Sequence, residues 1–278
     1  MKLWILFWFY KDIDICKNRL LLLRKYNPNS NIFWLYWWND DEAENFKNEL
    51  EFWLDDFYQI KEIGSFRKRI HGDLMILDRF NNRWIHLHRD SIVISQRDMI
   101  AFDSFEHIFA DIEKDQLYLP QYGFVDSKFE DKRRRTSKRL YESMDDLGKT
   151  KSYTYPNYIE FKKYVNHAYW YDKLIPYCIF MTAVLSRSFL LKYSQLPNIE
   201  LWFLEYKIPT YAKILWFDIY DKLYLWEKED NPETWNTPMN ALQIEVNKDF
   251  IDFELQKSSW WRVFHPYFHI YDFSKLKN

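Results

Sequence analysis

The amino-acid sequence predicts an α/β protein with a mostly parallel sheet, helices on both faces and one domain spanning residues 1–278. The first observation is that short apolar runs alternate with longer amphipathic segments through the first hundred residues. The second is that 278 residues can bury a full core and that no linker divides them. The third is that polar residues directly follow the apolar run Ser91–Ser95, where parallel sheets hold ligands.

Apolar runs of five to eight residues predict the strands of the first half, and segments with apolar residues at helical spacing predict the helices. In the first helix, Cys16, Leu20 and Leu23 form the apolar stripe, and Arg19 is expected on the polar side. The predicted strands are Leu3–Phe9, Ile32–Tyr36, Phe57–Ile60 and Ser91–Ser95. The predicted helices are Ile13–Tyr26, Glu42–Leu54 and Arg67–Phe80.

The second half is less regular. Its polar stretch near 126–154 is expected to be a loop or an insertion, because turn-forming and charged residues dominate it. Helices are expected at Tyr158–Asn166 and Ser186–Gln195, and strands at Tyr177–Ala183 and Arg262–Phe264. Two further segments are expected at Ile199–Tyr206 and Thr210–Phe217, with a corner between them at which Thr210 caps a helix.

Composition excludes several classes of protein. A formal net charge of -2 gives no bulk attraction to nucleic acid, although Lys128–Arg139 is locally basic. Cys16 and Cys178 lie far apart without metal-ligand spacing, so a reducing, cytoplasmic setting is expected. The apolar run Leu3–Tyr10 is much shorter than the roughly 20 residues of a membrane span. Peripheral contact with a membrane surface stays open, because aromatic residues make up 21% of the chain.

Glycine is scarce and tryptophan abundant, at 4 and 14 of 278 residues. Glycine usually makes up about 7% of a protein. Trp37, Trp38, Trp84 and Trp235 stand in or next to turn-like sequence, where glycine is physically expected. We therefore hypothesise that some of these codons specify glycine in the source organism, as a reassigned stop codon would produce. The alternative is a tryptophan-rich binding surface.

Three stretches resemble nucleotide-sugar-dependent glycosyltransferases of the GT-A fold: Ser95–Met99, Leu204–Thr210 and Val263–Pro266. The resemblance implies a GT-A-like, Rossmann-like sheet. It also implies a nucleotide-binding half at residues 1–110 and an acceptor-side half at residues 111–278. No Walker phosphate loop, dinucleotide-binding glycine motif or hydrolase nucleophile elbow is present in the sequence, which weakens the commoner nucleotide and hydrolase interpretations.

The family's metal motif is Asp-x-Asp after a strand, and this chain has Gln96-Arg97-Asp98 at that position. The resemblance implies that Asp98 and a late histidine, His265, bind Mn²⁺ or Mg²⁺, and hard oxygen ligands suit these ions. Gln96 offers a neutral carbonyl oxygen, and Arg97 offers positive charge to phosphate. Metal dependence is left open, because only one of the two acids is present. His269 is a weaker alternative ligand.

The resemblance makes Glu205 the general base that deprotonates the acceptor hydroxyl, with Glu200 as the alternative. Tyr10, at the end of the first strand, is expected to stack on the nucleotide base. Asp73 is expected to accept a hydrogen bond from the nucleotide. The arginines at 133–135 are expected to close over the diphosphate.

The function expected from this resemblance is transfer of a sugar from a nucleoside diphosphate sugar to a carbohydrate, lipid or protein hydroxyl, with inversion. The expected setting is glycan or glycolipid assembly in the cytoplasm, at the inner face of a membrane. The alternative is a non-catalytic carbohydrate-binding protein on the same fold. A nucleic-acid binder that uses Lys128–Arg139 ranks third, because the overall charge is mild.

Overall fold

A computed structural model gives the fold, and its description covers the ranges 2–9, 11–36, 40–59, 72–120, 122–125, 142–144, 150–152, 155–220, 238–239, 244–257 and 262–275. The chain divides into two compact units that interleave along the sequence. The first comprises Met1–Gln59, Ser91–Glu113 and Lys222–Asn278, and the second Ile60–Asp90 and Lys114–Asp221. The C-terminal segment therefore belongs to the same unit as the first strand.

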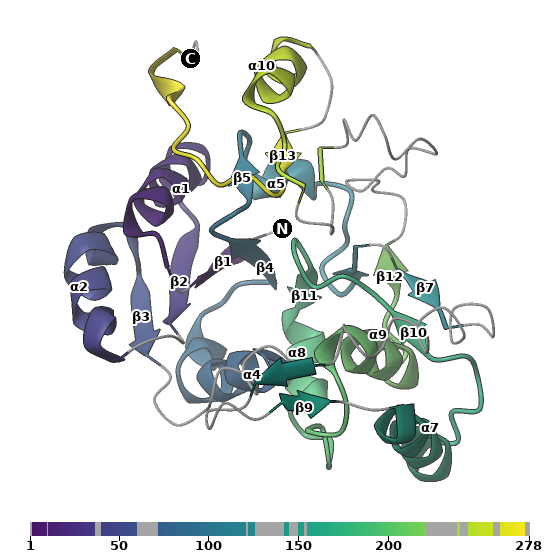
Figure 1. Ribbon diagram of the computed structural model, residues 1–278. Coiled ribbons are helices and arrows are strands. Elements are labelled where there is room, and N and C mark those ends of the chain that lie inside the picture. The colour runs from purple at the N-terminus through teal and green to yellow at the C-terminus, as the bar shows by residue number, and fades with distance from the viewer. Residues whose placement is uncertain are drawn as a thin grey trace. The chain divides into compact units, whose positions relative to one another are not determined.

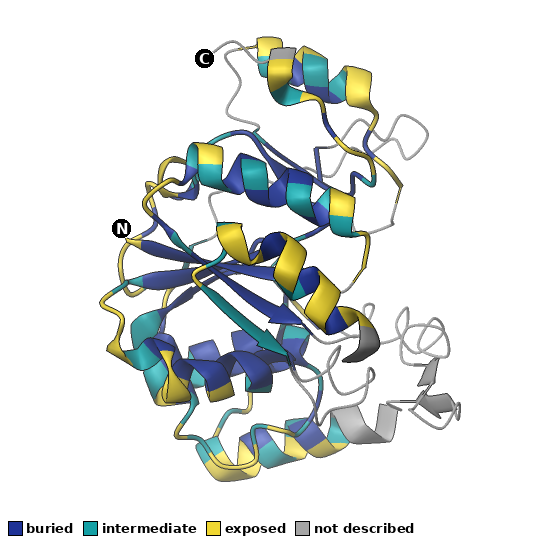
Figure 2. Cartoon of the chain, turned by 90° about the vertical axis from the view of Figure 1, so that its left-hand side faces the viewer, coloured by how far each residue is buried: buried dark blue, intermediate teal, exposed yellow. Residues whose placement is uncertain are grey.

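The first unit contains a parallel sheet in the order β4 (Ser91–Gln96), β1 (Leu3–Phe9), β2 (Asn31–Tyr36) and β3 (Asp56–Gln59). β1, β2 and β4 are almost wholly buried, as Figure 2 shows in dark blue. Burial on both faces explains why these strands read as continuous apolar runs rather than alternating ones. The predicted α/β class with a mostly parallel sheet and flanking helices is confirmed, and each of the four predicted strands of the first half forms.

The order of the strands reverses between β1 and β4. From β1 the chain adds β2 and then β3 on one side, and β4 returns to the other side of β1 (Figure 1). Trp8 near the end of β1 is in register with Gln96 at the end of β4, so the two strands finish at the same edge. In open parallel sheets such a reversal leaves a crevice at the carboxyl ends of the two strands, where ligands bind.

Helices α1 (Ile13–Tyr26) and α2 (Asp40–Leu50) connect these strands, and α2 continues into the short 3₁₀ turn η1 (Glu51–Trp53). The helix predicted at Glu42–Leu54 thus begins two residues earlier, at Asp40, and its last residues form a 3₁₀ turn instead of an α-helix. One expectation is wrong: Arg19 is buried within α1 rather than placed on its polar face. The shorter helices of this unit are α5 (Phe105–Ile108), α10 (Lys248–Gln256) and η3 (Phe273–Lys275).

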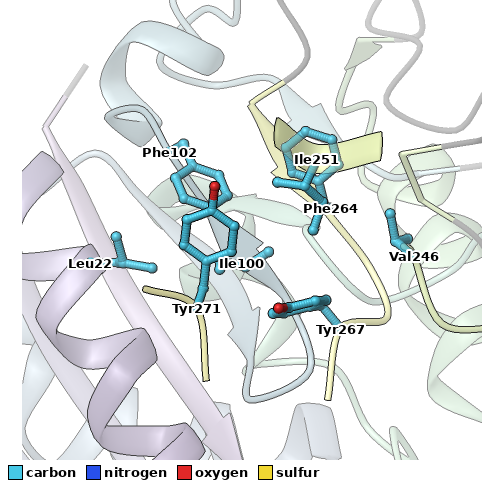
Figure 3. Close-up of a cluster of buried hydrophobic side chains, with 8 residues drawn as sticks. All are labelled: Leu22, Ile100, Phe102, Val246, Ile251, Phe264, Tyr267 and Tyr271. Carbon is cyan, nitrogen blue, oxygen red and sulfur yellow. The ribbon is translucent and has the colours of Figure 1, made fainter. Parts of the chain in front are cut away.

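A hydrophobic cluster fastens the C-terminal segment to the N-terminal half of the first unit. The short strands β5 (Ile100–Ala101) and β13 (Val263–Phe264) pair antiparallel, and their side chains pack with residues of α1 and α10. Figure 3 shows the buried members of this cluster: Leu22, Ile100, Phe102, Val246, Ile251, Phe264, Tyr267 and Tyr271. Full burial of one such side chain contributes about 1.5–3 kcal/mol to the free energy of folding. The cluster therefore holds the C-terminal segment firmly against β5 and α1.

The second unit contains shorter strands. β6 (Leu117–Tyr118) lies between β11 (Val184–Ser186), with which it is antiparallel, and β12 (Ile219–Tyr220), with which it is parallel. Two further antiparallel pairs are β7 (Gly123–Phe124) with β10 (Pro176–Tyr177) and β8 (Glu142–Met144) with β9 (Thr150–Ser152). The predicted Tyr177–Ala183 strand is wrong, because the chain leaves β10 at Tyr177 and turns at Met181 and Thr182.

The main helices of the second unit are α4 (Gly72–Asn82), α7 (Tyr155–Tyr169), α8 (Arg187–Tyr193) and α9 (Leu204–Ile214), and a short 3₁₀ turn, η2 (Trp84–His86), follows α4. The α8 helix begins where predicted, because the Ser186 side chain caps it by accepting from the Phe189 N–H at 3.2 Å. Residues 67–71 of the helix predicted at Arg67–Phe80, Ile60 of the third strand, and most of the polar stretch at 126–154 lie outside the described residues.

The expected corner before Thr210 is wrong, because α9 runs without interruption through Pro209. Proline has no N–H to donate to the carbonyl four residues earlier, which is that of Glu205. The Cys178 N–H donates to this carbonyl instead, at 2.9 Å. The helix therefore tolerates Pro209, and Thr210 is buried inside the helix rather than capping one.

Candidate functional site

Asp98 and His265 meet in the first unit, as the resemblance implied. Phe264 pairs with Ile100 at the end of the antiparallel β5–β13 register, and the Tyr267 N–H donates to the Asp98 carbonyl at 2.8 Å. This register brings His265 Nε2 to 3.6 Å from Asp98 Oδ1. The two residues are 167 positions apart in the sequence, and the hydrophobic cluster around β5 and β13 is what brings them together.

The pair lies at the edge where β1 and β4 end. Arg97 and Asp98 directly follow β4, and Asp12 lies three residues beyond β1. The Arg97 Nη1 and Asp12 Oδ2 atoms form an ion pair, in which the Asp12 side chain is 46% exposed and that of Arg97 10%. The reversal point of the sheet is therefore lined by two acids, one guanidinium and one imidazole.

Electrostatics keep Asp98 ionised. Burial raises the pKa of Asp98, but the adjacent His265 imidazole and the charge of Arg97 outweigh it, so the pKa lies below its usual value. The Asp98 side chain nevertheless remains 22% exposed. A charged carboxylate that keeps access to solvent is suited to meeting a cation or a hydrogen-bond donor from outside the protein.

Arg19 is the residue of this region that sequence reasoning missed. Its guanidinium donates to the carbonyls of Arg97 at 3.1 Å, Tyr267 at 2.8 Å and His269 at 2.9 Å. Burial lowers its pKa to about 10, so it stays charged. Arg19 thus joins α1 to the two segments that carry Asp98 and His265. A sequence signal existed, because Arg19 lies three residues after Cys16, on the apolar stripe of the helix.

Burial keeps both cysteine thiols protonated. Burial raises the pKa of the Cys16 thiol well above its usual value, although Cys16 lies close to Arg97. Burial and the negative charge of Glu205 raise the pKa of the Cys178 thiol in the same way. Both side chains therefore stay protonated at neutral pH, and a protonated thiol is a poor nucleophile and metal ligand.

Asp73 belongs to a buried cluster in the second unit. Its carboxylate accepts from the Tyr193 hydroxyl and from Lys207 Nζ, which is 2.9 Å from Oδ2 and 3.1 Å from Oδ1. Lys207 Nζ also donates to the Ile199 carbonyl at 2.7 Å. The side chains of Asp73 and Lys207 are 1% and 0% exposed. Three helices, α4, α8 and α9, are joined by this cluster, which is the arrangement of a structural ion pair.

Glu205 lies in the first turn of α9 and is partly exposed. The partial positive charge of a helix N-terminus stabilises a carboxylate there. The Glu205 charge also raises the pKa of the buried Cys178 thiol, so the two side chains are close. Glu205 belongs to the second unit, whereas Asp98 and His265 belong to the first.

The remaining predicted residues are placed as follows. Gln96 ends β4 with its side chain half-buried, and its carbonyl accepts from the Met99 N–H at 3.0 Å. The exposed His269 imidazole pairs with Glu245, with 3.3 Å between Nε2 and Oε2. Tyr10, Trp37, Trp38 and the arginines at 133–135 lie outside the described residues.

No group of three or more His, Cys, Asp or Glu side chains that could hold a metal occurs among the described residues. Asp98 supplies a carboxylate, the type of ligand that suits Mg²⁺ or Mn²⁺, and His265 supplies one imidazole nitrogen. Phosphate oxygens commonly complete such a coordination shell, since divalent cations in phosphoryl sites are bound by one or two carboxylates plus the substrate. Asp98 and His265 can therefore supply two of the ligands that a divalent cation requires.

No model of a known protein family and no curated protein sequence matches this chain. In the part of the chain that the structure describes, no helix has both the length and the apolar character needed to cross a membrane. The candidate site therefore depends on geometry: two acids, an arginine and a histidine at the point where the strand order reverses.

Proposed function

We propose that this protein is a nucleotide-sugar-dependent glycosyltransferase with a GT-A-like fold, which moves a sugar from a nucleoside diphosphate sugar to a hydroxyl acceptor. The observation that carries the proposal is the convergence of Asp98 and His265 beside Arg97 and Asp12, where β1 and β4 end. Ligands of parallel α/β sheets bind at such reversal points. The residue types are those that a diphosphate and its cation require.

The diphosphate is expected to bind through two kinds of charge. Asp98 and His265 would hold a Mn²⁺ or Mg²⁺ ion, which would supply positive charge to the diphosphate. Arg97 presents a planar guanidinium, whose donors match phosphate geometry. Gln96 adds a neutral oxygen, and Tyr10 is the proposed stacking partner of the nucleotide base. We assign Asp73 a structural role instead, because its two oxygens already accept from Tyr193 and Lys207.

Glu205 is the proposed general base. In an inverting transfer it removes the proton of the acceptor hydroxyl as that oxygen attacks the anomeric carbon. The bond between the anomeric carbon and the diphosphate oxygen breaks with its electron pair, and the departing diphosphate takes up the negative charge. Arg97 stabilises that charge as it develops, and a cation held by Asp98 and His265 would supply further positive charge there.

The proposed setting is assembly of a glycan or glycolipid, with a carbohydrate, lipid or protein acceptor, in the cytoplasm at the inner face of a membrane. This part of the proposal derives from the resemblance of Ser95–Met99, Leu204–Thr210 and Val263–Pro266 to the GT-A glycosyltransferases.

Donor turnover tests the proposed reaction. Purified protein is incubated with UDP- and GDP-sugars and Mn²⁺, and release of the nucleoside diphosphate is measured with and without candidate acceptors. Glu205→Gln is expected to lower the rate by about 10²–10⁴-fold, with the affinity for the free nucleotide unchanged. Glu200→Gln, at the alternative base, is expected to keep the full rate. A Glu205→Gln variant with the full rate would remove Glu205 as the base, and no turnover of any donor would count against an enzyme.

The second candidate function is a non-catalytic carbohydrate-binding protein. The observation that favours it is Gln96, which stands where the resemblance leads one to expect the first metal-binding acid. One carboxylate and one imidazole hold a cation less tightly than a pair of acids. Glycan binding by a protein that neither binds nor turns over any nucleotide sugar would support this alternative over transfer.

A further inference from the structure

Three tryptophans occupy backbone conformations that favour glycine. Trp170, Trp202 and Trp216 have φ angles of 56°, 69° and 62°. In this left-handed region the Cβ atom approaches the following carbonyl oxygen, a cost that only glycine escapes and that short polar residues reduce. Among the described residues the other non-glycine positions with positive φ are Asp12, Thr182 and Asn198, two of which are of that short polar type.

Trp216 ends α9 in a Schellman motif. The Phe217 N–H donates to the Ala212 carbonyl at 2.9 Å, and the Trp216 N–H donates to the Lys213 carbonyl at 3.2 Å. The residue in the left-handed position of this motif is usually glycine. The Trp216 side chain is 91% exposed, so packing does not offset the backbone cost.

Trp170 also follows the end of a helix, α7, although in a wider turn than the one at Trp216. It directly follows Tyr169, the last residue of the helix, and the Tyr171 N–H turns back to the Val165 carbonyl at 3.3 Å. Its side chain is 89% exposed. Two helices of the second unit thus end with a left-handed residue whose indole lies almost wholly in solvent.

Other tryptophans differ from these three in backbone conformation, although Trp202 is buried as they are, at 5% exposed. Trp4, Trp34 and Trp84 are at most 1% exposed, and none of them has a positive φ. The Trp34 ring packs edge-on against Phe57 with 4.5 Å between centroids. These side chains fill core volume as tryptophan does, and the backbone at Trp84 does not require the glycine that its turn-like sequence indicated.

We propose that positions 170, 202 and 216 are glycine in the native protein, encoded by a triplet that the printed sequence reads as tryptophan, whereas Trp4 and Trp34 are true tryptophans. The 4 glycines and 14 tryptophans of the chain have the imbalance that such a reading produces. The inference does not depend on the proposed function. Under it, the exposed indoles at 170 and 216 do not form a binding surface for a sugar or a membrane.

Peptide mass spectrometry of the protein purified from its source organism tests the assignment directly. Glycine is expected at 170, 202 and 216, and tryptophan at 4 and 34. In the gene, the codons for positions 170, 202 and 216 are expected to be the same triplet, and the codons for positions 4 and 34 are expected to be a different one. Tryptophan at 170 and 216 in the native peptides would overturn the proposal.

Thermal unfolding of the recombinant chain gives a second measurement. Trp170→Gly and Trp216→Gly are each expected to raise Tm by about 2 °C, because each removes a left-handed bulky residue without loss of packing. Trp53→Gly is the matched control. Trp53 is partly exposed and has no positive φ. Lys17 Nζ lies 5.4 Å from the centroid of its ring, so replacing Trp53 removes a contact and is expected to lower Tm. A fall in Tm for both helix-end variants would contradict the inference.

Discussion

The Asp98–His265 pair of the first unit and the Asp73–Lys207 pair of the second are both pairs of an acid with a base, but they differ in their access to solvent. Asp98 is 22% exposed and 3.6 Å from its partner atom, whereas Asp73 is 1% exposed and 2.9 Å from its own. Asp73 also accepts from Tyr193, so its oxygens are satisfied inside the protein. The contrast separates a group that can accept an external ligand from one that joins helices.

The largest expected effect is on stability in the second unit. Asp73→Ala leaves the Lys207 ammonium buried without its counter-charge, which typically costs about 3–5 kcal/mol. Urea unfolding measures the loss. Asp78→Ala, an exposed residue of the same helix, is the control and is expected to change stability by no more than about 0.5 kcal/mol. Equal effects of the two variants would show that the buried pair has no special structural role.

A smaller loss of stability is expected at Arg19. Arg19→Met leaves the carbonyls of Arg97, Tyr267 and His269 without this donor, at a cost of about 2–3 kcal/mol. Lys25→Met, an exposed residue of the same helix, is the control. Because Arg19 joins the segments that carry Asp98 and His265, the Met variant is also expected to weaken Mn²⁺-dependent nucleotide binding at temperatures where it is fully folded. Unchanged binding would confine Arg19 to a purely structural role.

The acid dependence of stability is expected to give the smallest effect. The pKa of Asp98 is lower in the folded protein than in the unfolded chain, so its contribution is complete above the unfolded pKa. That contribution is lost as the pH falls through the folded pKa. Urea unfolding of wild type from neutral to acid pH is therefore expected to show a steeper loss than Asp98→Asn, with His265→Gln intermediate. If the free energy of unfolding fell equally with pH in all three proteins, a stabilising interaction between Asp98 and His265 would be contradicted.

Local patterns predicted the sheet of the first unit because its strands are buried on both faces and its connecting helices are amphipathic. The expectation that Asp98 and His265 share a site came from the resemblance, because no local pattern spans 167 residues; the structure places His265 Nε2 3.6 Å from Asp98 Oδ1. Arg19 was missed because an arginine is usually placed on the polar face of an amphipathic helix, and the carbonyls to which it donates lie far away in the sequence. The α9 helix was missed because Pro209 normally ends a helix, and here a tertiary hydrogen bond from Cys178 compensates.

Isothermal titration of UDP and GDP, with and without Mn²⁺, tests the central claim most directly. Wild-type protein is expected to bind one of the two nucleotides more tightly when Mn²⁺ is present, and Asp98→Ala is expected to weaken that binding by at least about tenfold, or 1.4 kcal/mol. The matched control Asp78→Ala is expected to bind like wild type. Failure of the wild-type protein to bind either nucleotide, or equal Mn²⁺-dependent binding by Asp98→Ala, would contradict the claim that the ends of β1 and β4 form a diphosphate site.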